Sequence, residues 1–146
     1  MDNLKNKLKH LFDEVDIASI VVFRIFFGII MLWEVLRYFQ QNWIYTYWIE
    51  PDYHFPFWPF LDLRPLPGDG MFYLFYALGA LSICIILGLF YRASIILFFL
   101  GFSYMFLLEQ TRFLNHFYFV SLVSFIMCFI PASRSISLDA LIFRNK

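Results

Sequence analysis

Charged residues are scarce in this sequence, and lysine is missing from almost all of it. Asp, Glu, Lys and Arg make up 15% of the chain, whereas an average soluble protein has about 25%. No lysine stands between Lys9 and Lys146. The net charge at pH 7 is zero, which gives no reason to expect a nucleic-acid partner. The composition therefore argues against a soluble domain and against a nucleic-acid-binding protein.

Cysteines and recognisable catalytic or metal-binding motifs are also few. Cys84 and Cys128 lie inside apolar runs, so we expect no disulfide framework and interpret both as packing residues. His10, His54 and His116 are scattered, without an HxxxH or CxxC spacing, so no metal site is predicted. Nucleophile motifs and glycine-rich phosphate loops are absent as well. The reaction classes that depend on such motifs have no support in the sequence.

Long hydrophobic runs are what the sequence has instead. Hydrophobic residues make up 62% of the chain, and a membrane-spanning helix needs about 20 of them in a row. The pattern predicts an all-α integral membrane protein, a four-transmembrane-helix bundle with spans over residues 17–39, 71–91, 93–110 and 113–131. A turn centred on Tyr91 and Arg92 is expected between the second and third spans. The first run is too long for a signal peptide and lacks a cleavage site, so we interpret it as a retained helix.

Basic residues are distributed unevenly around the predicted spans. Four spans place both termini on one side, together with seven basic residues: Lys5, Lys7, Lys9, Arg92, Arg134, Arg144 and Lys146. The other side holds three, which predicts cytoplasmic termini in a multi-pass protein of the lipid bilayer. Residues 1–16 have one apolar face, typical of an amphipathic helix in the headgroup region; a soluble helix packed on the cytoplasmic loops is the alternative. Residues 141–146 are interpreted as a tail.

An aromatic, proline-rich loop is expected between the first two spans. Residues 40–69 contain three of the four tryptophans and five of the six prolines. Prolines interrupt helices, while aromatic rings prefer the membrane interface. We therefore predict a structured segment along the non-cytoplasmic membrane surface. It either covers a substrate cavity or serves only as an aromatic belt that anchors the helices.

Small residues recur at helical spacing in two of the predicted spans. Helices in lipid approach closely where side chains are small. We therefore predict packing faces at two stripes, one of Ala80, Cys84 and Gly88, the other of Ser121, Ser124 and Cys128.

Polar side chains gather where the third predicted span gives way to the fourth. These are Glu109, Arg112, Asn115, His116 and Tyr118. Ionisable groups near the hydrocarbon are costly and often functional. The start of a helix keeps an imidazole neutral, so His116 could accept or relay a proton. A purely structural histidine is the competing interpretation, as is a simple ion pair between Glu109 and Arg112.

The first predicted span carries three charged residues. Arg24 and Glu34 are ten residues apart, about 15 Å along a helix, so they cannot pair with each other. Arg24 therefore needs a partner from another helix, or must extend towards the cytoplasmic surface. Glu34 and Arg37 are three residues apart and are predicted to form a helical ion pair.

Five short motifs give the sequence a resemblance to a known family. They occur in order over residues 16–140: Phe23-Arg24-Ile-Phe-Phe-Gly28, Arg64-Pro-Leu-Pro67, Leu87-Gly88-Leu-Phe-Tyr91-Arg92-Ala-Ser94, Leu114-Asn115-His116-Phe-Tyr118 and Ser137-Leu-Asp139-Ala140. Together they resemble the vitamin K-dependent gamma-carboxylase-like family, whose members share the horizontally transferred transmembrane domain. That family oxidises vitamin K hydroquinone, removes a glutamate gamma-proton and adds CO2.

The resemblance implies roles for particular residues. Asn115 and His116 match the family's Asn-His motif, whose histidine is linked to the active site, and so become the catalytic candidates. The supporting polar residues are Glu109, Arg112, Tyr118, Arg92, Arg24 and Glu34. The residues themselves name no cofactor. The resemblance alone makes a reduced quinone of the vitamin K type a candidate.

The sequence also departs from the family pattern. The family's catalytic base is a lysine in a later span, downstream of the Ser-Leu-Asp-Ala stretch, and this chain has no lysine there. We therefore expect a module like the N-terminal half of the family, inactive alone and a carboxylase (a lyase-type enzyme) only when a second membrane polypeptide completes it. The alternative is a non-catalytic membrane scaffold, or a lipid- or quinone-binding subunit that assembles with other membrane proteins.

Overall fold

The computed structural model of the chain describes residues 18–51, 54–55, 57, 63–110, 114–133 and 137–143, and this part is helical without strands. The predicted amphipathic helix at residues 1–16 and the side chain of Arg112 lie outside the described residues. The elements in chain order are α2 (Ala18–Gln40), η1 (Tyr45–Ile49, a π-helix), α3 (Gly70–Leu87), α4 (Tyr91–Leu107), α5 (Asn115–Met127) and α6 (Leu138–Phe143).

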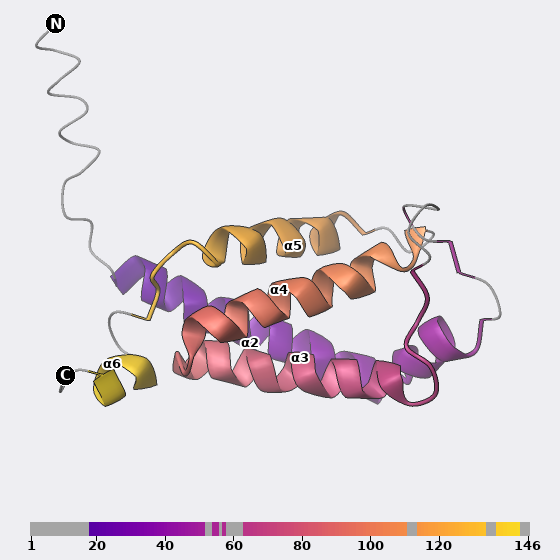
Figure 1. The fold of residues 1–146 in the computed structure, drawn as a ribbon, viewed down its shortest axis with the longest axis horizontal. Coiled ribbons are helices and arrows are strands. Elements are labelled where there is room, and N and C mark those ends of the chain that lie inside the picture. Colours follow the sequence, from indigo (N-terminus) through magenta and orange to yellow (C-terminus); the bar gives the residue numbers. More distant parts are fainter. Residues whose placement is uncertain are drawn as a thin grey trace, which may run out of the picture.

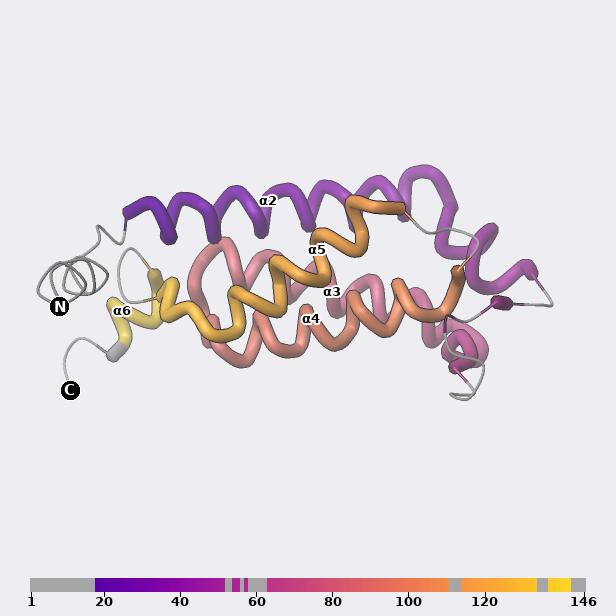
Figure 2. The backbone as a smooth tube through the Cα atoms, turned by 90° about the horizontal axis from the view of Figure 1, so that it is seen from above, coloured from indigo at the N-terminus to yellow at the C-terminus, as the bar shows by residue number. Residues whose placement is uncertain are grey.

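Four helices form an elongated bundle in which the chain reverses direction at each end. Figure 1 shows α2, α3, α4 and α5 running lengthwise, with α6 at one end and the segment around η1 at the other. In Figure 2, α5 crosses obliquely over α4. We call the end near α6 the clasp end and the end near η1 the cavity end. The beginning of α2 and the end of α5 both lie at the clasp end (Figure 1).

Two of the four helices are long and apolar enough to cross a membrane. They are α2, with 23 residues, and α3, with 18. The helices α4 and α5 are shorter, with 17 and 13 residues. The span predicted over residues 113–131 is thus helical over a shorter stretch, because the chain turns irregular after Met127 and Pro131 disfavours helix in the residue before it.

The turn between α3 and α4 lies earlier in the chain than the sequence predicted. Tyr91 and Arg92 are already the first residues of α4. The turn instead uses Gly88 and Phe90, which have φ angles of 63° and 43°. The N–H groups of Gly88 and Leu89 donate to the carbonyls of Ile85 and Cys84, the pattern of a Schellman motif. This motif requires a positive φ at residue 88, which glycine adopts without strain.

Small residues do bring α2 and α3 together, but not the stripe that the spacing predicted. Ala80 is exposed, so its assignment to a packing face was wrong. The close approach instead involves Gly28, where a Cβ would lie 2.6 Å from Ile86 Cγ1, and the buried Gly79 against Val35. On α5, Ser124 is fully buried, as its stripe predicted.

Aromatic side chains fill the space between the helices, and apolar side chains also cover the outside. Phe27 of α2 meets Phe98 of α4 edge-on at 5.8 Å. Large hydrophobic side chains are exposed along α2 and α5, among them Phe26, Ile30, Trp33, Phe119 and Phe125. An apolar exterior of this kind suits lipid surroundings better than water.

Candidate functional site

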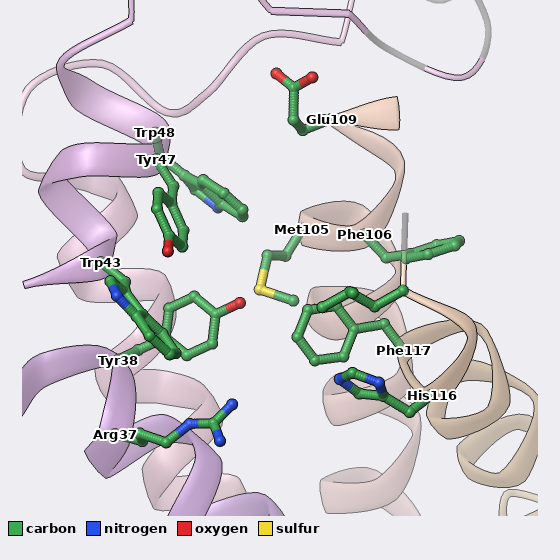
Figure 3. A pocket seen from close by; sticks show the side chains of 11 residues that line it. Arg37, Tyr38, Trp43, Tyr47, Trp48, Met105, Phe106, Glu109, His116 and Phe117 are labelled. Atoms are coloured by element: carbon green, nitrogen blue, oxygen red, sulfur yellow. The ribbon is translucent and has the colours of Figure 1, made fainter. Parts of the chain in front are cut away.

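A cavity of about 350 Å³ opens at the cavity end of the bundle. Its lining comes from four places: the end of α2, the segment around η1, the end of α4 and the start of α5. The lining residues are Arg37, Tyr38, Trp43, Tyr47, Trp48, Met105, Phe106, Glu109, Leu114, His116 and Phe117. The aromatic segment and His116, which the sequence marked separately, thus meet around one space (Figure 3).

Tyr38 is the residue that fixes the aromatic wall of this cavity. Its ring packs edge-on against Trp43 at 5.4 Å and Trp48 at 6.4 Å, and stacks on Phe75 at 4.9 Å. In Figure 3 its hydroxyl points into the cavity, towards Met105. Tyr38 lies one helical turn after Glu34 and therefore on the same face of α2. That periodicity was the signal in the sequence that could have marked it.

Arg37 forms the ion pair that the sequence predicted. Its Nη2 donates to Glu34 Oε1 at 2.8 Å, and its guanidinium lies 5.0 Å from the ring centre of Trp43. Arg37 Nε is buried without a hydrogen-bond partner among the described residues. Figure 3 shows the guanidinium directed across the cavity towards His116. Glu34 itself lines a narrow apolar crevice beside the cavity.

Trp48 presents a second donor without a partner. Its side chain is 5% exposed, and Nε1 has no hydrogen-bond partner within the described part of the chain. A buried N–H left in this state costs about 1–3 kcal/mol. Trp48 lines the cavity from η1, and a π-helical turn of this kind is frequent at functional sites.

The predicted polar cluster is only partly gathered at the cavity. His116 lines it from the first turn of α5, with its ring edge-on to Phe117 at 4.6 Å. Glu109 also lines it, is 7% exposed, and accepts a hydrogen bond from the Phe55 N–H at 3.4 Å. Asn115 and Tyr118 are exposed and lie outside the lining. Among the members of the cluster that the structure describes, His116 and Glu109 therefore share the cavity.

Two further candidates lie at the opposite, clasp end. Arg24 is 1% exposed and donates to the carbonyls of Ala132 at 2.8 Å and Ile86 at 3.4 Å. Its partners thus come from the end of α3 and the segment after α5. A charged residue inside a predicted span was expected to need such partners from other parts of the chain. Arg92 is exposed on the first turn of α4. The structure therefore separates Arg24 and Arg92 from the cavity.

Asp139 is a residue of the clasp end for which the sequence suggested no role beyond the motif. Its two carboxylate oxygens accept hydrogen bonds from the N–H groups of Phe90 at 2.8 Å and Tyr91 at 3.0 Å. It therefore caps α4 from a distant part of the chain. Asp139 can cap α4 only because α6 lies beside the turn between α3 and α4, and no local sequence pattern predicts this contact.

Neither end offers an evident metal site. Within the described residues, no group of three His, Cys, Asp or Glu side chains lies close enough to hold a metal ion. The cavity can instead surround a flat apolar molecule with aromatic rings. The N–H groups of the residues that line the cavity can bind oxygen acceptors on that molecule.

Comparison with known families identifies the chain. The family model of the HTTM domain matches residues 12–146, which is nearly the whole sequence. The chain belongs to this family, and the resemblance to the gamma-carboxylase-like family is confirmed. Together with two helices apolar enough to cross a membrane, the match indicates a membrane protein. No solved structure matches the chain.

Proposed function

We propose that this member of the HTTM domain family is a four-span membrane module with both termini in the cytoplasm. The distribution of basic residues supports this orientation. The helices α4 and α5 rise about 25 Å and about 20 Å, so they cross with the help of the residues that flank them. In this arrangement the cavity lies on the non-cytoplasmic side, and the segment around η1 covers it.

The cavity then serves as the binding site of a lipid-soluble ring compound. The observation that carries this proposal is the meeting of His116 with the η1 aromatics around one space of about 350 Å³, a size within the range of small-molecule sites. A reduced quinone of the vitamin K type, which the resemblance implies, fits this lining. The aromatic side chains of Trp43, Trp48 and Phe117 would hold its ring system.

Each neighbouring residue then has a definite task. A reduced quinone held there would supply reducing equivalents. His116 accepts or holds a proton at a ring nitrogen, as an imidazole can do. The rings of Tyr38, Trp43 and Phe117 exclude water, which strengthens each polar contact inside the cavity.

Carboxylation itself needs an amine that these residues do not supply. No lysine stands between Lys9 and Lys146, and the one permanent cation of the described cavity lining is Arg37, which keeps its proton in proteins. A second membrane polypeptide would provide the amine. We therefore expect the purified chain to incorporate no CO2 into glutamate peptides, and measurable incorporation would refute this part.

Ligand binding is the direct test of the proposal. Titration of a reduced 2-methylnaphthoquinone into the protein in detergent micelles should quench tryptophan fluorescence, and His116→Ala should weaken binding by about tenfold, the value of one hydrogen bond. His54→Ala is the matched control, because His54 lies outside the cavity lining. Undiminished binding by His116→Ala would remove His116 from the site.

A second candidate function is a non-catalytic scaffold that assembles with other membrane proteins. The exposed aromatic side chains of Phe26, Trp33 and Phe129 favour it, since such faces pack against either lipid or other helices. A protein that binds no ring compound but copurifies as a defined membrane complex would favour this role over the first.

A further inference from the structure

The unpartnered polar atoms around the cavity share one chemical property. Arg37 Nε and Trp48 Nε1 are buried and lack partners among the described residues. Both are N–H donors, and no side-chain acceptor of the described cavity lining is left in this state. The Arg37 side chain as a whole is 43% exposed, so its outward N–H groups favour a ligand that brings acceptor oxygens.

Arg37 is held in the orientation that binding an anion requires. Its Nη2 is fixed by Glu34 at 2.8 Å, and its guanidinium carbon lies over Trp43 at 5.0 Å. The other N–H groups of the guanidinium belong to a rigid planar fork, the geometry that matches a carboxylate. In Figure 3 this fork reaches into the cavity on the side of His116.

The other charges around the cavity limit which anion can bind. Glu34 makes one hydrogen bond to Arg37 and acts as its counter-ion. Glu109 lines the same cavity with a second carboxylate, bound to the Phe55 N–H, and Figure 3 shows it at the end away from Arg37. Two carboxylates facing one guanidinium disfavour a dianion such as phosphate. A ligand with a single carboxylate, placed beside Arg37, remains compatible with the carboxylates of both Glu34 and Glu109.

The rest of the ligand must be apolar, because aromatic side chains make up most of the lining. Trp43, Tyr47, Phe106 and Phe117 offer ring faces and edges, and the narrow crevice that continues beside the cavity is lined by Glu34 and otherwise mainly by apolar side chains. An amphiphile with one charged end matches this division.

We infer that Arg37 makes the cavity selective for an amphiphilic monocarboxylate, which binds the guanidinium beside Glu34 and shares it with the Glu34 carboxylate. This inference rests on the proposed function insofar as the cavity is a ligand site. It adds a ligand class, and it makes Arg37 the residue that distinguishes a carboxylate from its neutral analogue.

The test compares two ligands of nearly equal shape on the full chain and its variants. Isothermal titration of 2-naphthoate and 2-naphthamide into the protein in detergent micelles should show that Arg37→Gln weakens naphthoate binding by about 10- to 100-fold and leaves naphthamide binding unchanged. Glu34→Gln should tighten naphthoate binding, because it removes the competing carboxylate. Arg92→Gln at the clasp end is the matched control and should change neither.

The directions of these changes in affinity distinguish a role of Arg37 in ligand selectivity from a role in stabilising the fold. If the Glu34–Arg37 pair only stabilised α2, both substitutions would weaken both ligands, and the inference would be wrong. Arg37→Lys keeps the charge but loses the fork, so it should give an intermediate loss for naphthoate alone. Binding of naphthamide and reduced naphthoquinone without preference for naphthoate overturns this inference and leaves the proposed function standing. Failure of all three ligands to bind overturns both.

Discussion

The two ends of the bundle use polar residues in opposite ways. At the clasp end, the carboxylate of Asp139 accepts two backbone N–H groups, and the hydroxyl of Tyr91 donates to the Met127 carbonyl at 3.0 Å. At the cavity end, Arg37 and Trp48 keep buried N–H groups without partners among the described residues. The difference teaches that polar residues in a membrane protein must be sorted by their partners. Polar groups bonded within the chain hold the fold, whereas polar groups that line a cavity are available to a ligand.

The two ends also differ in how much free space lies between their side chains. A Cβ on Gly88 would lie 2.5 Å from the Ser137 Cβ and 2.6 Å from Arg24 Nη1, so the clasp end has no room for even a methyl group there. The cavity end encloses about 350 Å³. The clasp therefore provides a rigid base from which α2 and α4 hold the walls of the cavity.

The largest effect is expected from Gly88→Ala. The substitution forces a side chain into a left-handed conformation and against Arg24, and we expect it to lower the free energy of unfolding by about 3 kcal/mol. Titration with sodium dodecyl sulfate in micelles measures this value. Gly68→Ala is the matched control, because Gly68 has φ of 60° but no atom lies within 4 Å of where its new methyl group would be; it should cost about 1 kcal/mol. Equal losses for the two would contradict the close packing of the clasp.

A smaller loss should follow from Asp139→Ala. Removal of the carboxylate leaves the N–H groups of Phe90 and Tyr91 uncapped, which should cost about 1–2 kcal/mol in the same unfolding titration. Asp69→Ala is the control, since Asp69 precedes α3 without a side-chain capping hydrogen bond. A loss for Asp69→Ala as large as that for Asp139→Ala would show that the capping hydrogen bonds of Asp139 do not add to the stability of the fold.

The smallest change in stability is expected from Trp48→Phe at the cavity end. Lost packing and the removal of an unpartnered donor oppose each other, so the free energy of unfolding should stay within about 1 kcal/mol. Binding of reduced naphthoquinone should nevertheless weaken, because a smaller ring replaces the indole in the cavity wall. A strong loss of stability with intact binding would assign Trp48 to the fold instead of the site.

The helices were predictable from the sequence because apolar runs determine them. The end of α2, the start of α5 and the Glu34–Arg37 pair follow from length, proline positions and helical spacing. The turn at Gly88 was predicted too late in the chain, because the apolar run continues through it and only the positive φ angles mark it. The packing role assigned to Ala80 failed for a similar reason: a four-residue spacing does not say which face of α3 meets α2.

The site was only half visible in the sequence. His116 and Glu109 were identified because charges near hydrocarbon are conspicuous. Tyr38 was missed, because its helical spacing from Glu34 is a weak signal among so many aromatic residues until tertiary contacts select it. Arg24 was grouped with the cluster on the grounds of its chemistry, and only the chain reversal at each end of the bundle shows that it belongs to the clasp.

The most direct test of the distinction between the two ends measures stability and ligand binding on the same pair of variants. Unfolding titrations and titrations with reduced naphthoquinone are performed on Asp139→Ala and Trp48→Phe beside the unaltered chain. The structure predicts that Asp139→Ala loses stability but keeps its affinity, while Trp48→Phe keeps its stability but loses affinity. The reverse pattern, or equal losses of both properties in both variants, would contradict the division into a structural clasp and a ligand-binding cavity.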